Sequence, residues 1–429
     1  MPGYHHSVTL DKDKCTGCTS CLKRCPTEAI RVRDGKARII SERCIDCGEC
    51  IRVCPHHAKI AVTDPISDMK KYRYTVALPA PTLYGQFQGI SDVGQVINAL
   101  LDIGFDGVYE TSAGADVLSY HIRHMIQHQK GPRPLISSAC PAITRLIQVR
   151  FPSLRDNIVP MRAPVEVAAT LARESYCQKW SCDPSEIGIF FISPCPAKMT
   201  ARMAPLGNRT SNIDGVLSMM ELYGVLANKI SDNAKSGKKL PGRIGLAGGV
   251  GWAISGGEAA QAGIENCLAV DGIHNVIKAL EEIEDGRLSD LDFFEGLACN
   301  GGCVGGALVF EYSYIAKMRL KKLCQTMRSQ DRQSYRPSVQ MQDSQKLYFD
   351  TEIPPNPVLK LDPDFKVALK MMERIDAIEA DLPGLDCGSC GSPSCRCQAE
   401  DIVRGYSSEI DCIYKLKEKY RNLSLNEKN

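Results

Sequence analysis

The sequence predicts an α/β protein with parallel sheets in two lobes, preceded by a small α+β domain and followed by a small cysteine-rich domain. Two observations support this. From about residue 74 onward, short apolar runs alternate with amphipathic stretches, and the 21 cysteines gather in groups along the 429-residue chain. Alternating strand and helix patterns are typical of parallel α/β sheets, and this length allows two to four domains. We expect domains at 1–68, 69–357 and 358–429.

Composition excludes several classes of function. The 52 basic and 50 acidic residues leave a net charge of +2, which favours neither nucleic acid nor an anionic membrane surface as a partner. The uncharged run 244–257 is short and glycine-rich, so no membrane span is expected there. The first residues contain no apolar signal segment. Because the cysteines are spaced as metal ligands rather than as disulfide partners, we expect a reducing, cytoplasmic location.

The N-terminal domain contains an internal repeat. Residues 15–26 and 44–55 each follow the pattern Cys-x2-Cys-x2-Cys-x3-Cys-Pro, the spacing of two-cluster bacterial ferredoxins, in which the fourth cysteine of each run binds the other cluster. Cluster one is therefore assigned Cys15, Cys18, Cys21 and Cys54, and cluster two Cys44, Cys47, Cys50 and Cys25. A zinc ribbon is the alternative, although zinc sites use paired Cys-x2-Cys units. Residues 33–36 predict a hairpin.

The large domain is predicted element by element from its periodicity. In chain order we expect strands at 74–80, 107–110, 135–138 and 187–193, helices at 92–101, 117–129, 141–150 and 164–179, and a second lobe with strand-like 243–246 and 268–270 before a helix at 274–284. Ser91 is expected to cap the first helix. The glycines of 248–251 resemble a phosphate loop but lack the Gly-Lys-Ser/Thr ending, so a tightly packed loop is the better interpretation.

The segment 293–306, FFEGLACNGGCVGG, is the centre around which the domain is organised. Its glycines permit positive φ and close backbone approach, and Cys299 and Cys303 are spaced to share one side of a helical turn. Cys140 and Cys195 each follow a predicted strand and precede a proline. Since the carboxyl ends of parallel strands form sites, we expect the four cysteines to converge, although each alone would suit a buried core position.

The three segments around these cysteines resemble the three signatures of the FeFe hydrogenase catalytic domain, usually written TSCCP, MPCxxK and ExxxCxxGC, and the resemblance spans roughly residues 74–355. It implies two lobes with a cluster between them. It further implies a 4Fe-4S cubane on Cys140, Cys195, Cys299 and Cys303, a diiron unit carrying CO, cyanide and azadithiolate bridged through Cys303, and Lys198 pairing with a cyanide.

The chain departs from the family pattern at three places, two of which concern proton delivery. The cysteine that relays protons in the family is replaced by Ala139, and the methionine beside the bridging CO is replaced by Ser193. The segment 115–123, where the family supplies relay glutamates, contains none. Because alanine carries no proton, the standard relay is expected to be cut at its last step.

The C-terminal domain is predicted to begin with a helix at 364–380 after a proline-rich stretch. Its cysteines, Cys387, Cys390, Cys395 and Cys412, resemble the ligands of a small one-cluster domain of electron-transfer and sensory iron-sulfur proteins, with a helix at 398–408 before the last of them. Sixteen cysteines are thereby assigned to four 4Fe-4S clusters. No role is assigned to the remaining five, Cys177, Cys182, Cys267, Cys324 and Cys397.

Together these features predict a sensory-type FeFe hydrogenase that interconverts H2 with protons and electrons slowly. An ordinary ferredoxin-linked hydrogenase and a hydrogenase-like iron-sulfur assembly factor without the diiron unit are the alternatives. The expected partners are H2 and protons, a redox or downstream signalling protein, and hydrogenase maturation proteins, with no nucleic acid and no membrane. The oligomeric state is left open, with a homodimer among the options.

Overall fold

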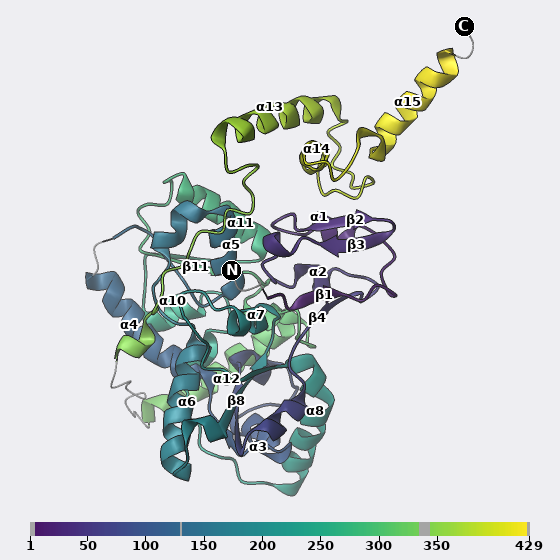
Figure 1. The fold of residues 1–429 in the computed structure, drawn as a ribbon. Helices are drawn as coiled ribbons and strands as arrows, with labels where there is room; N and C mark the ends of the chain where they lie inside the picture. Colours follow the sequence, from purple (N-terminus) through teal and green to yellow (C-terminus); the bar gives the residue numbers. More distant parts are fainter. Residues whose placement is uncertain (1–4, 129–130, 334–343, 427–429) are drawn as a thin grey trace. The chain divides into compact units, whose positions relative to one another are not determined.

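The computed structural model describes residues 5–128, 131–333 and 344–426 (Figure 1). The chain divides into two compact units. The first joins 1–45 and 49–60 to the C-terminal 355–429, and the second comprises 46–48 and 61–354. The sequence analysis gave the two ends of the chain separate domains and did not anticipate that they pack into one unit. The predicted boundaries at 68 and 357 stay predictions.

The second unit is built on two parallel sheets, as predicted. The four-stranded sheet has the order β6 (Gly107–Val108), β5 (Tyr74–Pro79), β8 (Ile187–Ser193) and β9 (Gly215–Ser218). The three-stranded sheet has the order β10 (Cys267–Asp271), β11 (Phe293–Leu297) and β7 (Leu135–Ile136). The predicted alternation placed β7 with the first lobe, but Leu135 pairs with Phe293 in the second sheet, because periodicity along the chain does not specify a strand's partner.

Helices surround both sheets (Figure 1). They are α3 (Gly94–Asp102), α4 (Thr111–His128), α5 (Pro141–Arg150), α6 (Pro164–Trp180), α7 (Ala197–Met203), α8 (Met219–Ser236), α9 (Ala247–Gly251), α10 (Gly257–Ala262), α11 (Ile273–Glu284) and α12 (Ser313–Gln333). All seven residues of β8 are buried, as expected of a central parallel strand covered on both faces. No helix in the described part of the chain is long and apolar enough to cross a membrane.

Two local predictions were wrong. The helix α3 begins at Gly94 rather than at residue 92, and Ser91 does not cap it; the carboxylate of Asp92 accepts from the Gly94 amide at 2.7 Å instead. Residues 243–246 form no strand. Their amide groups donate to buried carboxylates, as when the Leu246 amide donates to Asp116 at 2.8 Å. A segment whose amides are held by side chains cannot also donate them to a sheet.

The glycine-rich segment after this region packs as the sequence predicted. It forms α9, which lies against α4, and a Cβ atom added at Gly249 would lie 2.2 Å from the Ser112 carbonyl oxygen. That separation leaves no space for any side chain. The segment predicted to be a tightly packed loop is therefore a short helix that packs closely against α4.

The N-terminal part of the first unit contains β1 (Val8–Leu10), α1 (Ser20–Lys23), β2 (Ile30–Arg33), β3 (Lys36–Ile39), α2 (Glu49–Arg52) and β4 (Lys59–Ala61). The strands β2 and β3 form the predicted antiparallel hairpin. Its two turn residues, Asp34 and Gly35, both have positive φ, which is the requirement of the tight turn that matches strand twist.

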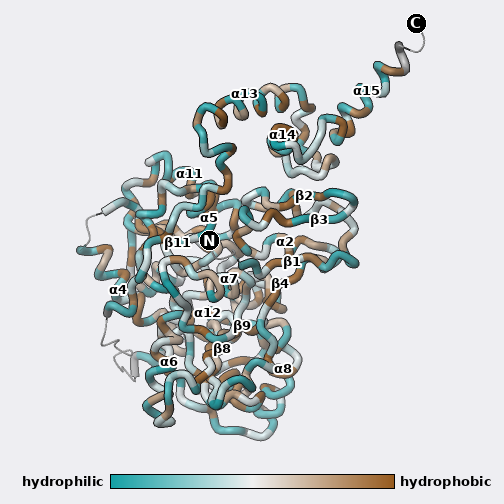
Figure 2. The backbone as a smooth tube through the Cα atoms, viewed as in Figure 1, coloured by the Kyte–Doolittle hydropathy of each residue, from teal (hydrophilic) through white to brown (hydrophobic). Residues whose placement is uncertain are grey.

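The C-terminal part contains α13 (Phe365–Asp381), α14 (Cys395–Val403) and α15 (Ile413–Asn426). Hydrophobic and hydrophilic segments alternate along α13 (Figure 2), and Asp364 caps it by accepting from two amides of its first turn. The helix predicted at 398–408 begins and ends earlier in the chain than expected. The helix begins at Cys395 because the Ser394 hydroxyl caps it by accepting from the Cys397 amide, and it ends at Val403.

Candidate metal centre

Three strand ends deliver four cysteines to one place in the second unit. Cys140 follows β7 and precedes α5, Cys195 follows β8, and Cys299 follows β11. The two sheets thus face the site with their carboxyl ends, as in other parallel α/β proteins.

The loop that carries Cys299 and Cys303 differs from the predicted helical turn. It is a non-helical turn followed by a single 3-10 turn, Cys303–Gly305. Gly301 and Gly302 have φ values of 82° and 101°, a region that only glycine adopts readily. A Cβ atom at Gly306 would lie 2.3 Å from the Pro194 carbonyl oxygen. The glycines therefore fold the loop back against the Cys195 loop, and this brings the cysteines together.

The four cysteines lie close to one another, with Cys299 buried and the other three partly buried. Burial raises the pKa of the Cys303 thiol well above its ordinary value, and nearby Cys140, Cys195 and Cys299 raise it further. Burial, followed by Cys299, raises the pKa of Cys195 to about 12. Buried thiols that repel one another as anions become stable thiolates when they bind a metal. Four such thiols are the ligand set of a 4Fe-4S cluster.

A cavity of about 80 Å³ lies beside Cys195 and Cys303. Its walls include Ala139, Lys198 and Trp252. The Lys198 ammonium donates to the Ala139 carbonyl at 2.9 Å. Two predicted site residues, Ala139 and Lys198, therefore lie together in the wall of this cavity.

Ser193, the fourth predicted residue of this region, does not line the cavity. Its hydroxyl donates to the Cys195 carbonyl at 2.9 Å and accepts from the Cys195 amide at 3.2 Å. Its visible role is to fix the backbone that carries Cys195.

Two cavity hydroxyls are suited to a polar ligand. The side-chain oxygens of Thr82 and Thr111 are buried in the cavity wall and have no hydrogen-bond partner among the described residues. Buried hydroxyls are rarely left unsatisfied. Thiols on one side, an ammonium group and two unpaired hydroxyls therefore fit a metal cofactor with polar ligands in this space.

The same cavity is lined by two buried carboxyls that the sequence analysis missed, Glu258 from α10 and Glu295 from β11. They are 3% and 1% exposed. The Ser137 hydroxyl donates to Glu258 at 2.5 Å, and the Gly256 and Ala259 amides donate to Glu295. Burial raises the pKa of both carboxyls, and the charge of Glu295 raises that of Glu258 further.

Sequence did contain a signal for one member of this pair. Glu295 is the single charged residue in a strand whose five residues are all buried, and buried ionisable groups cluster at functional sites. Glu258 follows two glycines without a comparable pattern. The absence of glutamate from 115–123 therefore does not leave the cavity without acids.

In the first unit, the predicted ligands of cluster one line one cavity: Cys15, Cys18, Cys21 and Cys54. Lys59 lines it too. Its ammonium group is buried and has no hydrogen-bond partner among the residues that the structure describes. Burial raises the pKa of Cys21 while the charge of Lys59 lowers it, so this cation lies close to the predicted cluster.

The four predicted ligands of cluster two come from separate segments of the chain. Cys25 follows α1, Cys44 follows a 3-10 turn and Cys50 lies in α2, all in the first unit, whereas Cys47 belongs to the short segment 46–48 of the second unit. Their convergence on one cluster stays a prediction.

The C-terminal cysteines gather around a small core. Burial raises the pKa of Cys390, and nearby Cys412 and Cys387 contribute to the rise. Cys395 and Cys412 pack in one apolar cluster with Ile375. The four predicted ligands of this segment are thus brought together within the first unit.

Three family models match the chain and define its class as a multi-cluster iron-sulfur protein. A 4Fe-4S dicluster domain matches residues 7–55, and a putative Fe-S cluster domain matches 382–414. The C-terminal domain of the iron-only hydrogenase large subunit matches 73–263 and 255–307, which is more than half of the chain. The chain therefore belongs to the iron-only, or FeFe, hydrogenase family.

The chain is also similar to individual proteins. The periplasmic Fe hydrogenase large subunit of Nitratidesulfovibrio vulgaris is 27% identical over 71% of this chain and 86% of its own length. Iron hydrogenase 1 of Clostridium pasteurianum is 24% identical over 70% of this chain and 64% of its own length. Among solved structures, an FeFe hydrogenase of Chlamydomonas reinhardtii is 14% identical, with 68% of this chain and 97% of that chain covered and a TM-score of 0.46.

Proposed function

We propose that this protein is an FeFe hydrogenase that interconverts H2 with two protons and two electrons, turns over slowly and serves H2 or redox sensing. Cys140, Cys195, Cys299 and Cys303 would hold a 4Fe-4S cubane, with Cys303 bridging to a diiron unit carrying CO, cyanide and azadithiolate. That unit, when bound, supplies the chemistry that cleaves and forms H2. The observation that carries the proposal is the cavity beside Cys303, with its ammonium group, unpaired hydroxyls and buried acids.

The residues of the cavity would bind and enclose the cofactor. Lys198 offers a positive charge to an anionic ligand such as cyanide, and the hydroxyls of Thr82 and Thr111 offer hydrogen bonds. The apolar side chains of Phe191, Trp252 and Ala253 form much of the remaining wall. They exclude water, which strengthens each of these electrostatic interactions.

Glu258 and Glu295 would hold the protons of the reaction. Because burial disfavours their charged forms, each keeps its proton to a higher pH than an exposed glutamate. Acids whose pKa is tuned toward the working pH transfer protons most effectively. The Ser137 hydroxyl, which donates to Glu258 and accepts from the Ala139 amide, ties this acid to the loop that lacks the family's relay cysteine.

The sensing role is supported by Ala139 and by the extra C-terminal cluster domain. The buried acids favour the second candidate, an ordinary hydrogenase that uses them as a relay. Turnover of the maturated protein, measured beside its affinity for H2, separates the two. Tight H2 binding with slow turnover supports sensing, whereas turnover typical of ordinary hydrogenases contradicts it.

An assembly factor that binds only the cubane is the third candidate. Infrared spectra of the maturated protein decide this point, because CO and cyanide ligands absorb where protein groups do not. Bands present in the native protein and absent from the Cys303→Ala variant support the hydrogenase proposal. If native protein that holds all of its 4Fe-4S clusters lacks these bands, the result supports the assembly factor instead.

The remaining parts of the proposal follow from the sequence. They are a cytoplasmic location, maturation by hydrogenase assembly proteins, and delivery of electrons or a signal to a separate redox or signalling protein. Fractionation of the producing cells and co-purification with a redox protein test the location and the partner.

A further inference from the structure

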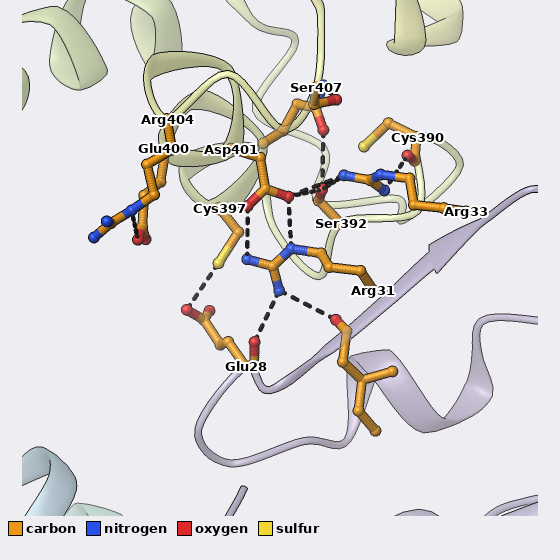
Figure 3. A network of polar contacts seen from close by, with 12 residues as sticks. Glu28, Arg31, Arg33, Cys390, Ser392, Cys397, Glu400, Asp401, Arg404 and Ser407 are labelled. Carbon is orange, nitrogen blue, oxygen red and sulfur yellow. Dashed lines mark hydrogen bonds and ion pairs between the residues drawn. The ribbon is translucent and has the colours of Figure 1, made fainter. Parts of the chain in front are cut away.

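The two ends of the chain meet in the first unit through a polar network that we call the docking network: Glu28, Arg31, Arg33, Ser392, Cys397 and Asp401 (Figure 3). The first three residues come from the N-terminal part and the last three from the C-terminal part. Arg31 donates twice to the Asp401 carboxylate, at 2.6 and 3.1 Å, and Arg33 donates to it at 2.9 Å. One carboxylate thus joins two guanidinium groups.

Burial makes this contact specific. The side chains of Arg31 and Asp401 are only 7% and 6% exposed. A buried ion pair is tolerated only when further hydrogen bonds satisfy it, and the Ser392 hydroxyl supplies one to Asp401 at 2.9 Å. Beside it, the Cys397 thiol donates to Glu28 at 2.8 Å. Separating the N-terminal and C-terminal parts would leave these buried charges without partners. The network therefore holds the two parts in one arrangement.

The network places two predicted cluster sites on either side of a direct backbone contact. The Val32 amide donates to the Gly391 carbonyl at 2.9 Å, and the Val32 side chain lines the cluster-one cavity. Gly391 follows the predicted ligand Cys390, whose carbonyl accepts from Arg33 at 2.9 Å. A Cβ atom at Gly391 would lie 1.9 Å from the Val32 carbonyl oxygen, so the approach is as close as backbones allow.

We propose that electrons enter and leave the N-terminal part through the C-terminal segment 387–412. This segment would exchange electrons with cluster one across the contact between Val32 and Gly391. Electron tunnelling falls off steeply with separation, and the hydrogen bond between Val32 and Gly391 is a direct backbone bridge between these two sites. The contact would pass one electron at a time, oxidising one site and reducing the other by one electron, with no bond formed or broken. Arg31, Arg33 and Asp401 act as positioning residues.

This proposal does not depend on the diiron unit, so it can be tested separately from the proposed function. The full-length chain is reconstituted with 4Fe-4S clusters only, reduced, and examined by electron paramagnetic resonance beside the Cys412→Ala variant, which removes the C-terminal site. The difference between the two spectra isolates the signal of the C-terminal cluster. A difference signal broadened or split by a neighbouring spin supports the proposal. A sharp signal of an isolated cluster overturns it.

Two variants test the positioning role. Asp401→Asn removes the charge that both arginines share, while Glu379→Gln is a matched control in the exposed pair with Arg396. We expect Asp401→Asn to keep about 16 iron atoms per chain and to lose the broadening, and Glu379→Gln to keep both. Arg33→Gln, which leaves the pair of Arg31 and Asp401 intact, guards against misfolding of the first variant. Partial loss of broadening in Arg33→Gln at full iron content supports the role, and unchanged broadening there overturns it.

Discussion

The buried carboxyls of the two units have opposite environments. Glu258 and Glu295 lie in the cavity beside Cys303 and form no ion pair among the described residues, whereas Asp401 accepts from two arginines. All three are almost inaccessible to solvent. Burial without an ion pair favours the protonated acid, whereas Asp401 is held by two guanidinium groups. The first arrangement can hold and release protons, and the second can only hold two segments together.

This difference separates a chemical role from a structural one without any change in residue type. Burial and then the charge of Glu295 raise the pKa of Glu258, and the hydrogen bond from Ser137 and the charge of Lys198 offset only part of that rise. The central claim is that the pair in the cavity retains a proton near neutral pH, because burial raises the pKa of both glutamates, and that it supplies the protons of H2 chemistry, whereas Asp401 links two segments of the chain. The predictions below test each side of this contrast, from the largest expected effect to the smallest.

Replacing Glu258 by glutamine should cause the largest loss. The amide keeps the shape and can still accept from Ser137, but it cannot release a proton. Because positioned acid-base groups contribute roughly 100- to 10,000-fold, we expect turnover of maturated protein to fall by about 100-fold or more while the infrared bands of the cofactor remain.

Glu166→Gln is the matched control for that variant. Glu166 is also buried and its pKa is also raised by burial, but it accepts from Ser211 and Asn212 and does not line the cavity beside Cys303. Its replacement should leave turnover within a few-fold of native. Equal losses from Glu258→Gln and Glu166→Gln would mean that burial, rather than position in the cavity, explains the effect.

Asp401→Asn should destabilise the first unit without affecting cavity chemistry. Removing one partner of a buried ion pair costs about 3–5 kcal/mol because the other charges are left uncompensated. Loss of the C-terminal cluster in urea, followed by its visible absorbance, should occur at a clearly lower concentration than in native protein. A midpoint equal to that of Glu379→Gln would show that the network contributes no stability.

Ala139→Cys should place a thiol in the cavity wall where the family has its relay. If proton delivery limits turnover, the rate should rise, by about 100-fold at most, because no upstream glutamate exists in 115–123. Turnover assays at constant H2 pressure measure this. An unchanged rate would indicate that Glu258 and Glu295 already deliver protons without limitation.

Lys59→Gln should produce the smallest effect, at cluster one. Its buried ammonium group lies in that cavity, and a nearby positive charge favours the reduced, more negative cluster. Removing it should lower the midpoint potential by about 60 mV, which corresponds to a tenfold change in a one-electron equilibrium. A redox titration followed by electron paramagnetic resonance measures the shift, and a potential that rises instead would contradict the assignment.

Sequence patterns predicted the strands that carry the cysteines but not the surroundings of those cysteines. The apolar run 187–193 and the Cys-Pro pairs predicted β8 and the placement of Cys195, because burial of a parallel strand leaves a periodic signal. The glycines after Cys299 likewise indicated a tight turn. Such signals are local, and they do not specify which distant segments meet.

The missed features are all long-range contacts. Glu258 and Glu295 are separated in sequence and share a cavity only because α10 packs beside β11. Arg31 and Asp401 are 370 residues apart, and no periodicity relates one hairpin strand to a distant helix. Apart from Glu295, which interrupts an apolar strand, each residue alone resembles an ordinary charged side chain, and only its burial in the fold distinguishes it.

The protonation state of the cavity carboxyls tests the central claim most directly. A protonated carboxyl has a carbonyl stretch that infrared difference spectra resolve from that of a carboxylate. Because the pKa of both glutamates is raised, this band should be present at neutral pH and disappear as the pH rises through the raised pKa. It should be lost or shifted in Glu258→Gln and Glu295→Gln, and unchanged in Asp401→Asn. Absence of the band from native protein at neutral pH, or its loss in Asp401→Asn alone, would contradict the account.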